Sequence, residues 1–160
     1  DRAGDGTELW SQSLSDCVSL SLGINDNILT VTGDNMAATY NADSGELIGN
    51  YSYPGTVENF DASSSLKAFV FDDFTDDGKK TVILNDKCEV TASIAVSADV
   101  KQIKVSGDTV LIMTESDITQ YNLSLESEKK TLLSDSYSDF IKVGGSVLLM
   151  GYDAIDSITL

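Results

Sequence analysis

The chain has 160 residues, of which 41% are hydrophobic, and its 26 acidic and 10 basic residues give a net charge of −16. This length is enough for one domain with its own core. A field of this sign repels nucleic acid and anionic lipid head groups, so we expect basic or neutral partners instead. Histidine is absent, which excludes a Ser-His-Asp site and any zinc site that needs histidine.

Neither a membrane span nor a signal peptide is expected. No apolar run approaches the roughly 18 to 20 residues that a membrane helix needs. The opening residues, DRAGDGTELW, lack a basic region followed by an apolar one. Removal of a signal or an anchor from a longer parent stays open as an alternative. The two cysteines, Cys17 and Cys88, are interpreted as small buried thiols, with a disulfide between them as the other option.

Taken in chain order, four apolar runs recur at a regular distance. They begin at Asn27, Lys67, Thr109 and Ser146. Steps of about 39, 43 and 37 residues separate equivalent positions, which is close to the length of a propeller blade of four strands. A shorter strand-like piece precedes each run, and a hairpin and a more polar segment follow it. The repeats are expected at 17–56, 57–97, 98–134, and 135–160 together with 1–14, within a single domain that spans 1–160.

The composition of these segments favours an all-β fold. They are rich in Val, Ile, Thr and Tyr and are separated by turn residues, and no helical period is present. The runs VLIM and VLLM are apolar on both faces, so both faces must be covered. Blades that are stacked around an axis cover each sheet in this way. We therefore predict a β-propeller-like fold with about four antiparallel blades of four strands.

The stretch NADSGELIG, residues 41–49, places Asp43 and Gly45 at a turn between the third and fourth strands of a blade. It resembles the D-x-x-T/S-G-x-x-x-W pattern of PQQ-like propeller repeats. When the last residues, SITL, are followed by the first, DRAGDGTELW, they align with ATYNADSGELIG, and Trp10 then falls near the position of Ile48. More broadly, the chain resembles PQQ-like and WD-repeat propellers, and most of all an uncharacterised cell-surface propeller-like family of Gram-positive bacteria. The resemblance implies a place outside the cytoplasm or at the cell surface. The chain lacks the complete motif in every repeat and has no adjacent Cys pair, so no quinone cofactor is expected.

The last repeat ends at DSITL without a fourth strand, and the first 14 residues look like a fourth strand without a blade. We expect the N-terminal strand to complete the last blade. The chain then closes on itself as four blades. Two alternatives stay open: it is part of a larger propeller, or two copies join through their ends as a homodimer.

Residues 73–82, DFTDDGKKTV, resemble the calcium loop of FG-GAP propeller repeats. Asp73, Thr75 and Asp77 fall at the alternate positions where calcium takes oxygen ligands. Thr81 stands where that pattern has a carboxylate, so we predict an exposed acidic hairpin without calcium. No other cofactor is expected.

The sequence favours a non-catalytic, extracytoplasmic propeller module that binds a protein or a glycan. Trp10, Tyr51 and Tyr53 are the candidate recognition residues, because aromatic side chains bury much area at interfaces. Packing between blades is the other interpretation of these rings. Two alternative functions stay open. One is a hydrolase or lyase that uses carboxylates in the propeller channel; the other is a structural half of a larger or dimeric propeller.

Overall fold

The computed structural model describes residues 8–14, 17–53, 55–62, 66–73, 78–96 and 99–160. These residues form 15 strands and no helix. The first sheet, sheet A, consists of β1 (Ser19–Asn25), β2 (Ile28–Gly33), β3 (Met36–Asn41) and β4 (Leu47–Ser52). Sheet B consists of β5 (Thr56–Ala62), β6 (Lys67–Asp73), β7 (Gly78–Leu84) and β8 (Val90–Val96). Sheet C consists of β9 (Gln102–Ser106), β10 (Thr109–Met113), β11 (Asp117–Asn122) and β12 (Ser127–Leu132). Sheet D has three strands, β13 (Asp139–Val143), β14 (Ser146–Met150) and β15 (Ile155–Thr159).

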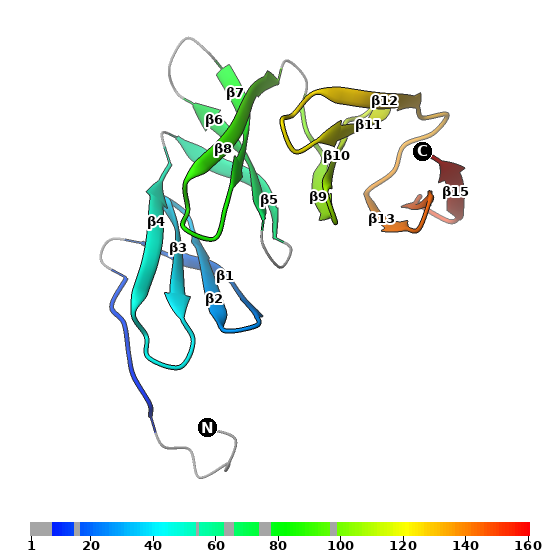
Figure 1. Cartoon of the computed structure of the whole chain (residues 1–160). Helices are drawn as coiled ribbons and strands as arrows, with labels where there is room; N and C mark the ends of the chain where they lie inside the picture. Colours follow the sequence, from blue (N-terminus) through cyan, green and yellow to red (C-terminus); the bar gives the residue numbers. More distant parts are fainter. Residues whose placement is uncertain (1–7, 15–16, 54, 63–65, 74–77, 97–98) are drawn as a thin grey trace.

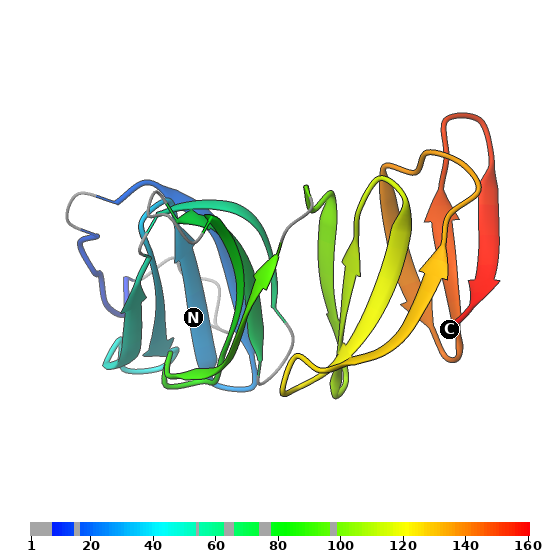
Figure 2. The same cartoon turned by 90° about the horizontal axis from the view of Figure 1, so that it is seen from above.

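The four sheets follow one another along an arc. Each is an antiparallel meander in which neighbours in sequence are neighbours in the sheet. The first strands of the sheets (β1, β5, β9 and β13) lie on the concave side of the arc, and the polar strands β4, β8 and β12 lie on the outside (Figure 1). Seen from above, the sheets stand face to face in a row (Figure 2). The predicted β-propeller-like fold is confirmed, with four consecutive blade-like sheets.

The middle strands are apolar because each is covered on both faces. All five residues of β10 are buried, whereas β12 is exposed at nearly every position. Sheets A and B meet around Ala37, Phe69 and Phe71. Sheets B and C meet in a cluster that contains Val70 and Ile112. Sheets C and D enclose an equivalent cluster of apolar side chains, namely Leu111, Met113, Ile118, Phe140, Val147 and Leu149.

The turn between the third and fourth strands recurs in sheets A, B and C. It begins at Asn41, Asn85 and Asn122, and the Oδ1 atom of each accepts hydrogen bonds from two backbone amides of the turn. One residue of each turn has positive φ: Gly45 at 72°, Cys88 at 58° and Leu125 at 57°. Only the first is glycine. The side chains of Cys88 and Leu125 are buried, and the free energy of this burial offsets the backbone strain that positive φ causes in residues other than glycine.

The position of the N-terminal segment differs from the prediction. Residues 8–14 lie against sheet A, where the indole Nε1 of Trp10 donates a hydrogen bond of 3.0 Å to the carbonyl of Ala42. Gln12 donates in the same way to the carbonyl of Gly45, at 3.1 Å. Sheet D lies at the other end of the arc, and no described strand pairs with the outer edge of β15 (Figure 1). The prediction that this segment completes the last blade of its own chain is therefore wrong for the described residues.

Both cysteines are free thiols, Cys88 buried and Cys17 partly exposed. Within the described part of the chain, no helix has the length and apolar character needed to cross a membrane.

Candidate functional site

A recess opens between sheets C and D, at the ends of strands where connecting loops gather. Three segments contribute to it: Lys101 just before β9, the connection between β12 and β13, and the tight turn between β14 and β15. The lining residues are Lys101, Ser136, Tyr137, Ser138, Gly151 and Tyr152. Loops at the end of a stacked sheet can vary without disturbing the core, which makes this a suitable place for a binding site.

A small polar network fixes one wall of the recess. The Lys101 ammonium forms an ion pair with Glu115 and donates a hydrogen bond of 3.2 Å to the Ser136 hydroxyl. That hydroxyl in turn donates to Glu115 Oε1 at 2.9 Å. These hydrogen bonds from Lys101 and Ser136 lower the pKa of Glu115, so its carboxylate stays ionised. The carbonyl of Lys101 accepts a hydrogen bond of 2.7 Å from Asn59, which ties the wall to sheet B.

Two tyrosines with opposite environments form the rest of the recess. Tyr137 is buried, and its hydroxyl donates a hydrogen bond of 2.9 Å to Asp156 Oδ2. This hydrogen bond raises the pKa of Tyr137, and the ring is held as a fixed floor. The side chain of Tyr152, at the tip of the β14–β15 turn, is fully exposed. Covering such a ring with a bound partner is favourable, because the ring has a large apolar area and a polar tip.

The groups that line the recess are suited to contact a bound ligand. The carboxylate of Glu115 is held ionised by its partners, whereas a general acid needs a raised pKa. Asp135 and Asp153, adjacent in sequence to lining residues, are exposed and add negative charge. The Lys101 ammonium is already neutralised by Glu115. The surface around Tyr152 therefore suits an apolar or aromatic group that is followed by positive charge.

Tyr51 and Tyr53, which the sequence marks as candidates for recognition, lie between sheets A and B. The ring of Tyr53 packs against Phe69 and Phe71, with centroids 5.4 and 4.9 Å away. Tyr51 packs against Phe71 at 6.1 Å. Both tyrosines thus extend the core between two blades. A binding role for them stays a prediction, and the recess above does not include them.

Trp10 packs onto the recurring turn of sheet A. Its ring stacks on Tyr40, with centroids 6.5 Å apart and planes 29° from parallel. The backbone of Gly45 passes so close that a Cβ there would lie 2.6 Å from the indole Cδ2 atom. The first candidate for recognition is thus engaged within its own chain.

Two of the three predicted calcium ligands lie outside the described residues. Thr75 and Asp77 are not described, and Asp73 is described only as the last residue of β6. Within the same stretch, the ammonium of Lys79 lies between Asp99 Oδ1 at 2.6 Å and Glu58 Oε2 at 3.0 Å. Hydrogen bonds to these two carboxylates raise the pKa of Lys79 to about 12. In the described part of the chain, no group of three or more acidic or cysteine side chains is arranged to hold a metal ion.

Sequence reasoning missed Tyr152, Tyr137 and Lys101. The signal that could have revealed Tyr152 is the short sequence GYDA, an aromatic residue at the tip of a tight hairpin. A ring at such a tip cannot reach the core of its own sheet. Lys101 and Tyr137 carry no comparable signal, because they come together with Tyr152 only when sheets C and D are packed.

The comparisons with known proteins agree with this fold. A model of a family of unknown function (DUF5711) matches residues 22–160. The chain is similar to the solved structure of BamB from Moraxella catarrhalis, with a TM-score of 0.64 at 9% identity over 86% of this chain and 41% of that one. It is also similar to the WD40 domain of coronin from Toxoplasma gondii, with a TM-score of 0.66 at 15% identity over 88% and 42%. Sqt1 from Saccharomyces cerevisiae gives a TM-score of 0.62 at 15% identity over 90% and 46%.

The chain thus spans less than half of the length of each of these structures. At these identities the likeness concerns the fold alone. No curated protein matches the sequence.

Proposed function

This chain belongs to the family DUF5711, whose function is unknown, and we propose that it is a non-catalytic propeller module that binds a protein partner outside the cytoplasm. The observation that carries the proposal is the fully exposed Tyr152 at the rim of the recess between sheets C and D. Exposed aromatic rings beside a fixed polar wall are typical of binding sites, where tyrosine often contributes much of the affinity.

The charges around the recess define the chemistry of the partner. Glu115 and Lys101 neutralise each other as an ion pair, whereas Asp135 and Asp153 are exposed and leave a net negative charge. A peptide segment with an apolar or aromatic side chain and a neighbouring Lys or Arg complements this arrangement. The net charge of −16 steers such a segment toward the molecule and keeps acidic partners away.

Two features support the non-catalytic part of the proposal. Histidine is absent from the whole chain. Hydrogen bonds from Lys79 lower the pKa of Asp99, and those from Lys101 and Ser136 lower the pKa of Glu115. A carboxylate-dependent hydrolase needs at least one carboxyl with a raised pKa. The extracytoplasmic location rests on the resemblance to cell-surface propeller repeats.

The test is a binding assay on arrays of synthetic basic, neutral and acidic peptides, run in parallel with a glycan array. We expect binding to basic peptides that contain an aromatic residue, and weaker binding as salt screens the charges. Tyr152→Ala should abolish most of this binding. Val90→Ala is the matched control, because it shortens an exposed apolar side chain at the start of β8, outside the recess.

Peptide binding that Tyr152→Ala leaves unchanged would contradict the proposed site. Binding on the glycan array alone would replace the protein partner with a carbohydrate. Turnover of either ligand, lost when one carboxylate is replaced, would favour the enzyme alternative instead.

A further inference from the structure

A second hollow, of about 210 Å³, lies on the concave side of the arc, where the first strands of sheets B, C and D approach one another. Strands β5, β9 and β13 lie on this side of the molecule (Figure 1). The hollow is separate from the recess beside Tyr152, because the recess begins at Lys101, before β9, whereas the hollow extends to Ser106, at the end of that strand. Its lining residues are Asp61 on β5, Lys104, Val105 and Ser106 on β9, and Ile141 and Lys142 on β13.

The two lysines of the hollow come from facing sheets and share the gap between them. In an antiparallel pair, residues directly opposite each other lie on the same face of the sheet. Lys104 pairs with Leu111, which belongs to the apolar cluster between sheets C and D, so Lys104 faces sheet D. Lys142 pairs with Val147 of the same cluster and therefore faces sheet C. The packing of these two sheets brings two positive charges to one place in a chain whose net charge is −16.

Lys142 is a half-buried cation that forms no ion pair with a carboxylate among the described residues. Its ammonium donates hydrogen bonds to neutral oxygens, Thr109 Oγ1 at 2.9 Å and Gln120 Oε1 at 3.4 Å. An ammonium has three N–H donors, so one is left for a further acceptor. Two other lysines, Lys67 and Lys79, lie 2.8 and 2.6 Å from a carboxylate oxygen. A positive charge that is partly removed from water is favourable only beside a negative group or enough acceptors.

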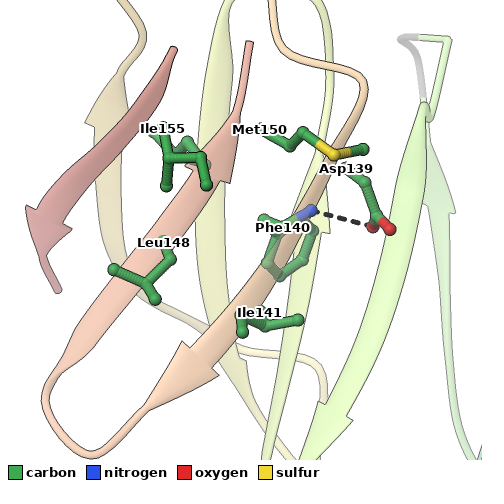
Figure 3. Close-up of a pocket in the computed structure, with 7 residues that line it drawn as sticks. Asp139, Phe140, Ile141, Leu148, Met150 and Ile155 are labelled. Atoms are coloured by element: carbon green, nitrogen blue, oxygen red, sulfur yellow. Dashed lines mark hydrogen bonds between the residues drawn. The ribbon is translucent and has the colours of Figure 1, made fainter.

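Lys104 has even fewer contacts with hydrogen-bond acceptors. Its ion-pair partner in the described part of the chain, Asp139 Oδ1, lies 3.7 Å from the ammonium, which is too far for a hydrogen bond. Asp139 Oδ1 instead accepts a hydrogen bond of 2.8 Å from the amide of Phe140 (Figure 3). The Ser106 hydroxyl also makes no hydrogen bond to a described residue, although the Ser106 carbonyl accepts one from Thr109. Three donor groups of the hollow thus have unused hydrogen-bonding capacity.

One wall of the hollow is acidic. The Oδ2 atom of Asp61 accepts a hydrogen bond of 2.7 Å from the amide of Val105, which fixes this carboxylate between sheets B and C. Asp61 and Asp139 match the two lysines in number, so binding here depends on close hydrogen bonds rather than on an excess of positive charge. A ligand that complements the hollow therefore has an anionic group for the lysines and a hydrogen-bond donor for Asp61. The side chain of Ile141, 56% exposed, adds an apolar contact.

We propose that the hollow is a binding site for a small oxyanion that also has hydroxyl groups, such as an acidic sugar. Lys104 and Lys142 hold its carboxylate or phosphate group from two sides, and the Ser106 hydroxyl donates a further hydrogen bond. A hydroxyl group of the ligand donates to the carboxylate of Asp61. At physiological ionic strength, exposed charges more than about 8 Å away are largely screened, so the adjacent ammonium groups outweigh the net charge of the molecule. This inference does not depend on the proposed binding of a protein beside Tyr152.

Isothermal titration calorimetry of the 160-residue chain with four probes tests the site. Glucuronate and glucose 6-phosphate each combine an oxyanion with hydroxyl groups, and comparing them shows whether a carboxylate or a phosphate is preferred. Glucose lacks the anion, and sulfate lacks the hydroxyl groups. We expect at least one of the two acidic sugars to bind with a dissociation constant of about 1 mM or less, and glucose and sulfate to bind about tenfold more weakly or worse.

Replacing either lysine should weaken the binding of the acidic sugar. Lys104→Gln should raise the dissociation constant about tenfold or more and leave the fold intact, because the ammonium makes no hydrogen bond to a described residue. Lys142→Met should have the same effect on binding, but it also removes the hydrogen bonds to Thr109 and Gln120 and should lower stability. Lys129→Gln is the matched control, because it changes the net charge equally at an exposed lysine of β12, outside the hollow. It should leave the dissociation constant unchanged.

Two further measurements separate binding from a structural role. In urea titrations, the bound sugar should raise the free energy of unfolding of the wild type, and this gain should be absent in Lys104→Gln. Asp61→Asn keeps an acceptor for the Val105 amide but removes a negative charge, so sulfate should bind this variant more tightly than it binds the wild type. Tyr152→Ala should not change the affinity for any of the four probes, so the two proposed sites can fail separately.

Three results would overturn the proposal. The first is that neither acidic sugar binds the folded protein with a dissociation constant of about 1 mM or less. The second is that Lys129→Gln weakens binding as much as Lys104→Gln does, which would mean that only the net charge matters. The third is that glucose binds as tightly as the acidic sugars, which would place the affinity outside the pair of lysines. Circular dichroism of each variant confirms that the sheets are folded.

Discussion

Trp10 fills the space that a side chain at Gly45 would need. A Cβ on Gly45 would lie 2.6 Å from the indole Cδ2 atom, and φ of Gly45 is +72°. The Trp10 Nε1–H donates to the Ala42 carbonyl in the same turn. One residue of the N-terminal segment thus uses both the shape and the hydrogen-bonding capacity of the turn between β3 and β4.

Gly45→Ala should therefore destabilise the protein in two ways. The new methyl group collides with the indole, and the positive φ disfavours any side chain. We expect the free energy of unfolding to fall by about 2 kcal/mol or more. Trp10 is the only tryptophan, so its fluorescence should also shift toward that of an exposed indole.

The control for this prediction is Gly107→Ala. Gly107 has φ of +62°, but an added Cβ would meet no atom within 4 Å. It therefore carries the backbone strain without the collision, at a cost of about 1 to 2 kcal/mol, and the tryptophan emission should stay unchanged. Equal loss of stability in both variants, with no change in emission, would mean that Trp10 is not docked on the turn.

Lys67 is a buried cation, 1% exposed, and its ammonium lies 2.8 Å from Asp86 Oδ1. Asp86→Asn should leave this charge without its partner and lower the free energy of unfolding by about 3 kcal/mol. Adding Lys67→Met to Asp86→Asn removes the unpaired charge and should recover much of the loss. Asp99→Asn, which removes a fully exposed partner of Lys79, serves as the control in urea titrations and should cost far less, because solvent screens this pair. A double variant less stable than Asp86→Asn alone would refute this account.

The hydroxyl of Tyr53 is buried among aromatic rings and has no hydrogen-bond partner among the described residues. Burial raises the pKa of Tyr53 well above its usual range. Tyr53→Phe should therefore raise the melting temperature, with a gain in stability of about 1 kcal/mol. Tyr137→Phe should have the opposite effect, because it removes a hydrogen bond to Asp156. A lower melting temperature for Tyr53→Phe would reveal a partner for its hydroxyl.

Asp117 contributes stability that depends on pH. Burial raises the pKa of Asp117, but the hydrogen bond and charge of Lys130, 3.0 Å away, outweigh this effect and hold it below its usual range. A carboxyl whose pKa is lowered by folding stabilises the protein at pH values above its pKa in the unfolded chain, which is about 3.9. This contribution is lost as pH falls through the pKa of the folded state. The wild type should thus begin to lose its advantage over Asp117→Asn below about pH 5, and should lose the rest as pH falls through the lowered pKa of the folded state. Urea titrations of the two proteins over this pH range measure the difference in stability.

The prediction that the loop of residues 73–82 binds no calcium remains to be tested. Thr81 replaces a carboxylate of the calcium pattern, and its side chain is buried within β7. Millimolar calcium should therefore raise the melting temperature no more than magnesium does, since any divalent cation screens a charge of −16. A rise specific to calcium and abolished by Asp77→Ala would contradict this prediction.

The sequence alone determined the order of strands and the fold. Runs such as VLIM at 110–113 are apolar at every position, and only a sheet covered on both faces can bury them. The recurring turn begins with Asn41, Asn85 and Asn122. The side-chain oxygen of asparagine can accept hydrogen bonds from the backbone of its own turn, so this residue type is typical of such turns. These signals are local, so they can be read without knowing what lies across the sheet.

Only the tertiary structure decided where the segment 8–14 lies and which residues form the recess. The sequence of the segment 8–14 is compatible with the edge of sheet D and with the face of sheet A. The segment lies against sheet A because the indole of Trp10 packs against Gly45. Tyr51 packs against Phe71 between two sheets, whereas Tyr152 extends into solvent. The difference arises from which sheet packs on which, and such packing depends on contacts between residues far apart in the chain.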